Sequence, residues 1–138
     1  MGSYKRRRST MAVDDSHRSA AASAIGALRH EVKWKPGKGE PYLAKRKVLG
    51  HLTREATMDD YNTVIATLLN DANSLVYHYP FGLKDYYAVS GDIKGATWLV
   101  IFGEDGVLET AFPPDDLADY LTKRGFVSLG RLEEVCHE

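Results

Sequence analysis

Cysteine is almost absent from this chain of 138 residues, which contains only Cys136. A lone cysteine excludes an internal disulfide framework and favours a reducing compartment, so we expect a cytoplasmic protein. Long apolar runs are missing too, because the longest one, Trp98–Phe102, has the length of a strand. A helix that spans a bilayer needs roughly 20 apolar residues, and we therefore expect no membrane association.

Signatures of a specific catalytic or cofactor-binding class are also lacking. Walker loops, paired CxxC motifs, HExxH and GxSxG are all absent. The histidines stand far apart along the chain and have no cysteine partners, so we expect no metal site and no cofactor. They occupy positions 17, 30, 51, 78 and 137.

Charge is abundant and is divided between the two ends of the chain. Residues 1–56 hold thirteen Lys and Arg against five Asp and Glu, whereas residues 57–138 hold five against fourteen. A basic segment of this kind is typical of chains that bind a polyanion or an acidic partner. The two halves could equally neutralise each other within the fold, and about 1 M salt would then lower the stability by screening exposed pairs.

The first half of the sequence predicts helices. Residues 1–12 are polar and basic without periodicity, so we expect a flexible basic arm, followed by a single domain over residues 13–138. Two helices are predicted over Asp14–Leu28 and Pro41–Thr53. A third begins after Thr57, because one apolar stripe recurs there at helical spacing. Its members are Tyr61, Val64, Ile65, Leu68 and Leu69.

After residue 73 the hydrophobic period changes to two, which indicates strands. We expect four strands, near residues 74–79, 86–90, 97–102 and 107–112. The turns between them are short, so neighbouring strands are antiparallel. A short helix is predicted over Leu117–Lys123, and a last helical turn is predicted through Leu129, Leu132 and Val135. The fold class is therefore α+β: N-terminal helices followed by a four-stranded antiparallel sheet and short C-terminal helices.

His51 is the residue that most suggests chemistry. It follows the basic run Lys45, Arg46 and Lys47, and it precedes Arg54 by three residues, which is one helical turn. An imidazole that titrates near neutral pH suits proton transfer at a phosphodiester, and nearby cations suit charge developing on phosphorus. A surface histidine in a solvated basic helix is the alternative interpretation.

Thr110 and two tyrosines are the other candidates. Strand alternation places Thr110 on the face of Leu108 and Phe112, where its hydroxyl could hydrogen-bond a phosphate, although threonine is also common in strands for its propensity alone. Tyr77 and Tyr86 belong to an aromatic-rich hairpin and could stack on bases. The simpler interpretation of these rings is packing against the sheet.

The order of the expected elements and two short motifs resemble the small ribonuclease toxins of the barnase/EndoU/colicin/RelE-like superfamily. The resemblance covers roughly residues 45–114. The matching residues are Lys47, His51 and Arg54 in the basic segment, and Gly106, Thr110, Phe112 and Pro113 around the late strand.

This resemblance implies metal-independent cleavage of RNA, in which the ribose 2′-hydroxyl attacks the adjacent phosphate. It implies three catalytic residues: His51 as general acid or base, Arg54 beside the phosphorane together with Lys47, and Thr110 on the scissile phosphate. Substrate would also contact Lys45, Arg46, Lys47, Tyr77 and Tyr86. RNA is then the expected partner, together with a neutralising antitoxin protein.

A non-catalytic interaction domain remains the alternative. Its basic half would bind nucleic acid or an acidic protein, and its acidic half would bind a basic partner, such as a toxin that it neutralises. The division of charge and the lack of a compact catalytic signature favour this class.

Overall fold

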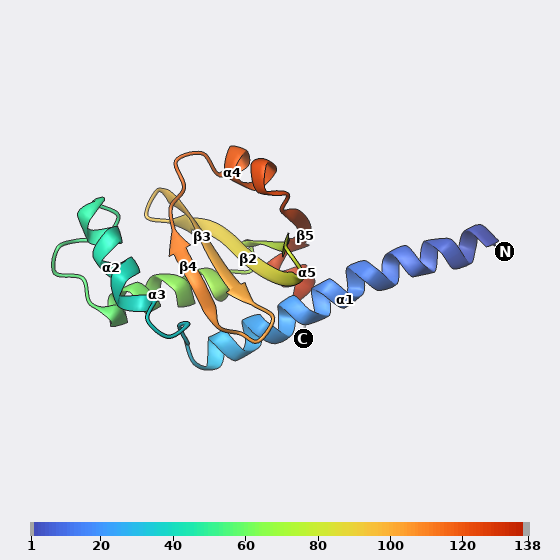
Figure 1. Cartoon of the computed structure of the whole chain (residues 1–138), viewed down its shortest axis with the longest axis horizontal. Helices are drawn as coiled ribbons and strands as arrows, with labels where there is room; N and C mark the ends of the chain where they lie inside the picture. The colour runs from blue at the N-terminus through green and yellow to red at the C-terminus, as the bar shows by residue number, and fades with distance from the viewer. Residues whose placement is uncertain (1, 137–138) are drawn as a thin grey trace.

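A computed structural model describes the chain from Gly2 to Cys136, and for residues 2–14 it describes the backbone alone. The fold class is α+β, as the sequence predicts (Figure 1). The helices are α1 (Gly2–His30), α2 (Gly39–Val48), α3 (Met58–Leu69), α4 (Leu117–Arg124) and α5 (Leu132–Val135). The strands are β1 (Leu75–Phe81), β2 (Lys84–Ile93), β3 (Ala96–Gly103), β4 (Leu108–Phe112) and β5 (Val127–Arg131).

The strands form one antiparallel sheet in the order β4-β3-β2-β1-β5. Four of them are those expected from the sequence, and β5 is additional. The predicted last helical turn is too long, because β5 pairs with β1 and only Leu132–Val135 is helical. Gly130 has a φ of +112°, which a right-handed helix does not allow.

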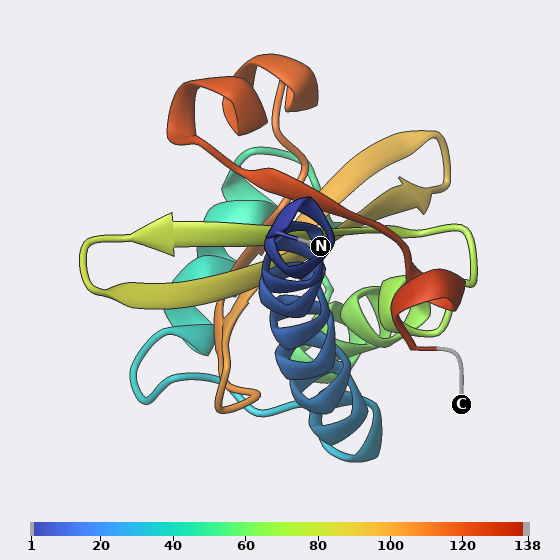
Figure 2. The same cartoon turned by 90° about the vertical axis from the view of Figure 1, so that its right-hand side faces the viewer.

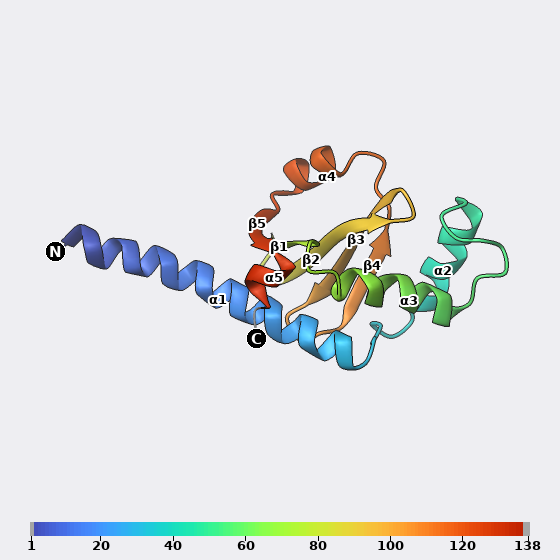
Figure 3. The same cartoon turned by 180° about the vertical axis from the view of Figure 1, so that it is seen from behind.

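Helices cover both faces of the sheet. Figure 2 shows α1 and α3 on one side of the strands and α4 on the other. The larger core lies beneath α1 and α3, and a smaller aromatic core lies beneath α4. Figure 3 gives the same arrangement from behind. β3 contributes to both cores, through Val100 and Phe102 on one face and Leu99 and Ile101 on the other.

Helix α1 includes the predicted helix Asp14–Leu28. Its C-terminal part packs on the sheet through Ala21, Ile25 and Leu28, and its N-terminal part extends away from the body (Figure 1). The backbone of residues 2–12 belongs to α1, and the side chains of residues 2–14 lie outside the described part of the chain. The boundary expected after residue 12 therefore stays a prediction.

Helix α3 confirms the strongest helical pattern of the sequence. Thr57 and Asp60 form a capping box, in which the Asp60 amide donates to the Thr57 hydroxyl at 3.2 Å and the Thr57 amide donates to Asp60 at 2.8 Å. On the buried side of α3, the Tyr61 hydroxyl donates to the carbonyl of Ala111 in β4. This bond anchors the end of β4 immediately before Phe112.

We expect Tyr61→Phe to lower the free energy of unfolding by about 1–2 kcal/mol, because the buried Ala111 carbonyl loses its donor. Urea denaturation measures this change. Tyr42→Phe is the matched control, since the described residues offer no hydrogen-bond partner to its hydroxyl. Equal stability of the two variants would show that the Tyr61 hydroxyl does not anchor β4.

Strand β4 changes register beside β3. Thr110 lies opposite Ile101 and Phe112 lies opposite Leu99, but an irregularity after Ile101 places Leu108 opposite Phe102. Leu108 therefore belongs to the core beneath α1 and α3. The prediction that Leu108 shares a face with Thr110 is wrong, because the extra residue of the irregularity reverses the alternation.

Candidate functional site

His51 lies just beyond α2, where the helix closes with a Schellman motif. The amide of His51 donates to the carbonyl of Arg46 at 2.8 Å, and the amide of Gly50 donates to the carbonyl of Lys47 at 3.1 Å. Gly50 has a φ of +76°, which glycine adopts without strain. The cap therefore fixes the backbone of His51 against the carbonyl of Arg46, five residues before it.

The helix predicted over Pro41–Thr53 is wrong at its C-terminal end, because α2 ends at Val48. Left-handed backbone at Gly50 cannot continue a right-handed helix. Arg54 consequently lies in the following loop, where it is exposed, and it shares no helical face with His51.

A cavity of about 680 Å³ lies between the end of α2, the end of β4 and α4, and we call it the α2–α4 cavity. Its volume is in the range of small-molecule sites. Four cations and three carboxylates line it. The lining residues are Lys45, Arg46, Leu49, His51, Phe112, Pro113, Pro114, Asp115, Asp116, Asp119, Tyr120, Lys123 and Arg124.

Arg46 is the most unusual side chain of this cavity. Only 4% of it is exposed, and its Nε is buried without a hydrogen-bond partner. In the described part of the chain no carboxylate lies within 4.0 Å of its guanidinium, which stands 5.7 Å from the centre of the Phe112 ring. Burial lowers the pKa of Arg46 from its ordinary value. Buried cations are normally paired, so this group lacks an anion.

His51 shares the electrostatic environment of Arg46. Burial first, and the neighbouring Arg46 second, lower the pKa of His51 below its ordinary value of 6.5, against an opposing effect of Asp115. The imidazole is therefore mainly neutral at about pH 7. Its Nδ1 is buried and lacks a hydrogen-bond partner, which is the state of a group that a ligand or an ordered water completes.

The carboxylates of the cavity are partly engaged in local structure. Asp116 caps α4 by accepting from the Asp119 amide at 3.0 Å, and Asp119 pairs with Lys123 at 3.1 Å. Arg124 lies over the Tyr120 ring, 3.8 Å from its centre. Among the three carboxylates of the cavity only Asp119 is paired with a cation of the described residues, and none of them pairs with Arg46.

The residues predicted from the sequence divide between this cavity and the rest of the fold. Lys45, Arg46 and His51 line the cavity together, as the basic segment suggests. Lys47 and Arg54 do not line it. The cavity also includes Tyr120, Lys123 and Arg124, which the sequence did not single out. The sequence offers little reason to choose them, because Lys123 and Arg124 lie in the last turn of a short helix, where basic residues are common.

Thr110 also lies outside the cavity. It shares its sheet face with Phe112, which lines the cavity two residues further along β4, and strand geometry places their Cα atoms about 6.6 Å apart. Tyr77, Ala88, Ile101 and Thr110 form one row across the four strands from β1 to β4.

The two candidate tyrosines differ in exposure. Tyr77 is buried, its hydroxyl lies 3.0 Å from Ser90 Oγ, and its ring packs edge-on against Phe126. Packing, the simpler interpretation, therefore fits Tyr77. Tyr86 is half-buried at the edge of the same aromatic core and has an accessible side.

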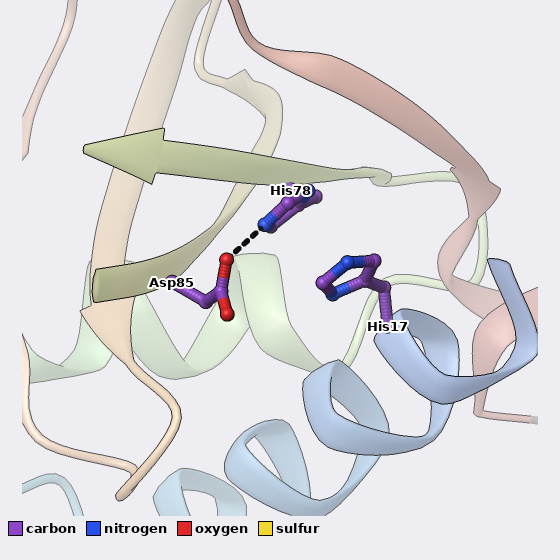
Figure 4. Close-up of side chains that lie close together, drawn as sticks. All are labelled: His17, His78 and Asp85. Carbon is purple, nitrogen blue, oxygen red and sulfur yellow. Dashed lines mark hydrogen bonds and ion pairs between the residues drawn. The ribbon is translucent and has the colours of Figure 1, made fainter. Parts of the chain in front are cut away.

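A second group of polar side chains lies away from the α2–α4 cavity, where α1 meets the β1–β2 hairpin. His17 of α1 stacks on His78 of β1, with ring centres 3.7 Å apart, and His78 Nε2 lies 2.7 Å from Asp85 of β2 (Figure 4). His17 Nδ1 lies 2.9 Å from the Tyr87 hydroxyl. Burial first, then Asp85 and Glu104, raise the pKa of Tyr87 to about 12, so the hydroxyl keeps its proton. The histidines that are scattered in sequence thus include one close pair.

No protein family, curated protein or solved structure was found to match this chain. Within the described residues no helix combines the length and the apolar character that crossing a bilayer requires.

Proposed function

We propose that the chain is a metal-independent endoribonuclease of the toxin-like kind, with its active site in the α2–α4 cavity. The observation that supports this most is the buried Arg46 guanidinium, which has no carboxylate partner among the described residues and lines the same cavity as His51, whose pKa is lowered. Together they provide an anion-binding group and a proton acceptor in one cavity. The resemblance to small ribonuclease toxins rests on the same basic segment.

A phosphodiester fits the electrostatic requirement of the cavity. The guanidinium of Arg46 would bind two phosphate oxygens at once, which restores the missing partner of a buried cation. Lys45, Lys123 and Arg124 surround the same space and would hold the neighbouring phosphates of the strand. His51 also borders a second cavity, whose charged lining residues are two carboxylates, Asp60 and Asp92, and one cation, Lys94. The α2–α4 cavity, with four cations against three carboxylates, is therefore the side that favours an anion.

The chemistry requires one proton acceptor and stabilisation of an anionic phosphorane. The ribose 2′-oxygen bonds to phosphorus while the bond from phosphorus to the 5′-oxygen breaks, which leaves a 2′,3′-cyclic phosphate and a 5′-hydroxyl end. His51 accepts the proton of the 2′-hydroxyl as general base. Arg46 stabilises the charge on the phosphorane oxygens, and water supplies the proton that the 5′-oxygen takes up.

The other predicted residues would extend the binding surface beyond the cavity. Thr110 lies one pleat from Phe112 and would contact an adjacent phosphate, with the half-buried Tyr86 further along the same face. Lys47 and Arg54 would attract the RNA backbone without contacting the reacting phosphate. The expected substrate is cytoplasmic RNA, and an antitoxin protein would act by covering the cavity.

Cleavage of RNA in the presence of EDTA tests this proposal directly. We expect the full chain to cleave single-stranded RNA and to leave 2′,3′-cyclic phosphate ends, identified by mass spectrometry. An oligonucleotide of the same sequence with 2′-deoxyribose throughout is the matched control, because it lacks the attacking hydroxyl. Cleavage of the RNA and of the deoxy control at similar rates would refute the proposed 2′-hydroxyl mechanism. Failure of the folded protein to cleave RNA at all would refute the proposal that it is a ribonuclease.

The second candidate is an interaction domain that binds without turnover. Two apolar side chains at the end of α2, Val48 and Leu49, are exposed to 85% and 55%, and Leu49 lines the α2–α4 cavity. Exposed apolar residues beside a charged cavity are typical of a surface that binds another protein. No cleavage in the same assay, together with a gel shift that shows RNA or a protein partner bound to the chain, would favour this function.

A further inference from the structure

We propose that His17, His78 and Asp85 form a binding site for a divalent transition-metal ion of the zinc class. One potential ligand atom from each of the three residues lies within 4.8 Å of the other two. The ligands come from three separate elements, α1, β1 and β2, and Figure 4 shows the three side chains close together.

The donor set determines the class of ion. Two imidazole nitrogens and one carboxylate oxygen suit zinc, cobalt and nickel, whereas calcium and magnesium prefer oxygen ligands alone. Three protein ligands leave a fourth position of a tetrahedral ion for water or another small ligand.

Binding requires the side chains to adjust: the His17 ring, now stacked within 20° of the His78 ring, tilts so that both ring nitrogens point at one ion, and the His78–Asp85 pair opens slightly. Two ligands of one tetrahedral zinc ion lie about 3.4 Å apart, given bonds of about 2.0–2.1 Å. His78 Nε2 and Asp85 Oδ1 are closer than this, at 2.7 Å, because they now bond to each other. An ion replaces that bond when the two side chains separate by less than about 1 Å, which a rotation of the exposed Asp85 side chain supplies.

The surroundings hold the histidines in position. His78 is only 9% exposed, in the middle of β1, and its ring stacks on the ring of His17. The Tyr87 hydroxyl, 2.9 Å from His17 Nδ1, holds the second ring in a fixed orientation. Groups of this kind orient coordinating imidazoles in metal sites. Asp85 is partly exposed, so an ion has a path from solvent.

Binding at this site would join α1 to the β1–β2 hairpin. None of its three residues lines the α2–α4 cavity, so the site is separate from the proposed active site. Ribonuclease activity in EDTA and metal binding are therefore independent properties of the chain.

Titration of the full chain with Zn²⁺ against a chromogenic chelator tests the proposal. We expect one ion per chain and a rise in Tm of roughly 5 °C or more when zinc reaches about a hundred times its Kd. His17→Ala and Asp85→Asn should each weaken binding at least about 100-fold, since even groups that only orient a ligand are worth 10- to 100-fold. His30→Ala, which removes an exposed histidine of the same helix, should leave the affinity unchanged.

Cobalt spectroscopy provides a readout that does not depend on stability. We expect Co²⁺ to give an absorption spectrum of tetrahedral or five-coordinate type in the wild type and in His30→Ala, and not in His17→Ala or Asp85→Asn. Circular dichroism establishes that each variant is folded. Equal zinc affinity of the wild type and a folded His17→Ala variant would overturn the proposal, as would the absence of any zinc binding by the wild type.

Discussion

Replacing His51 with alanine is expected to reduce kcat/KM for RNA cleavage by about 10²- to 10⁴-fold, the usual contribution of a positioned general base. The side chain is the proposed proton acceptor of the α2–α4 cavity, and no other histidine of the described residues lines that cavity. Single-turnover cleavage of a labelled oligonucleotide, with EDTA present, measures the effect. His30→Ala is the matched control, since His30 is exposed at the end of α1.

The same assignment also predicts how kcat/KM depends on pH. Burial and Arg46 disfavour the protonated imidazole, so the pKa of His51 lies below 6.5 in the free protein. A general base acts in its neutral form, and kcat/KM should therefore be constant near pH 7 and fall as the pH drops through that lowered pKa. An acid limb centred above 6.5, or His51→Ala activity equal to that of His30→Ala, would contradict the assignment.

Replacing Arg46 with methionine is expected to reduce cleavage by about 10²- to 10³-fold without loss of stability. The first effect follows because, in the proposed mechanism, the phosphorane would lose its principal charge-stabilising donor. The second follows because a buried cation without a partner costs free energy that an apolar side chain of similar length does not. We expect the free energy of unfolding to stay unchanged or to rise by up to about 2 kcal/mol, as measured by urea denaturation.

Arg29→Met is a control with the opposite expectation. The Nε of Arg29 donates to the carbonyl of Leu69 at 2.6 Å and so joins α1 to the end of α3. Its loss should lower the free energy of unfolding by about 1–2 kcal/mol and leave cleavage unchanged. If Arg46→Met were instead destabilised to the same extent with normal cleavage, Arg46 would be a structural residue and the phosphate site would be excluded.

Arg46→Met should also move the pH profile. Removal of the cation abolishes its repulsion of the protonated His51, so the pKa of His51 rises and the acid limb shifts to higher pH. This shift distinguishes loss of the neighbouring charge from a general distortion of the cavity, because distortion alone gives no defined direction.

The basic segment illustrates how far sequence reasoning extended to the candidate site. The sequence shows that this segment is basic and contains His51, but it does not show which of its cations is buried. Weak periodicity in α2 gave no reason to prefer Arg46, and the packing of α2 beside Phe112 buries it. The C-terminal end of α2 could have been predicted, because Gly50 is a typical residue for the left-handed position after a helix.

Strand β5 and the His17–His78 pair depended on contacts between distant segments. The spacing of Leu129, Leu132 and Val135 suits a helix locally, yet β1 offers an unpaired edge that recruits Val127–Arg131 as a strand. Pairing with β1 therefore outweighs the short helical pattern of residues 129–135, because whether a segment forms a strand depends on the strands beside it.

Local periodicity by itself determined the α+β class, α3 with its Thr57 cap, and the meander from β1 to β4, because each of these depends on residues close together in the chain. The tertiary structure alone decided which charges meet. Residues from α2, β4 and α4 converge on one cavity, and His17 and His78 come together across the sheet. Such convergence is set by the packing of elements, which no local pattern encodes.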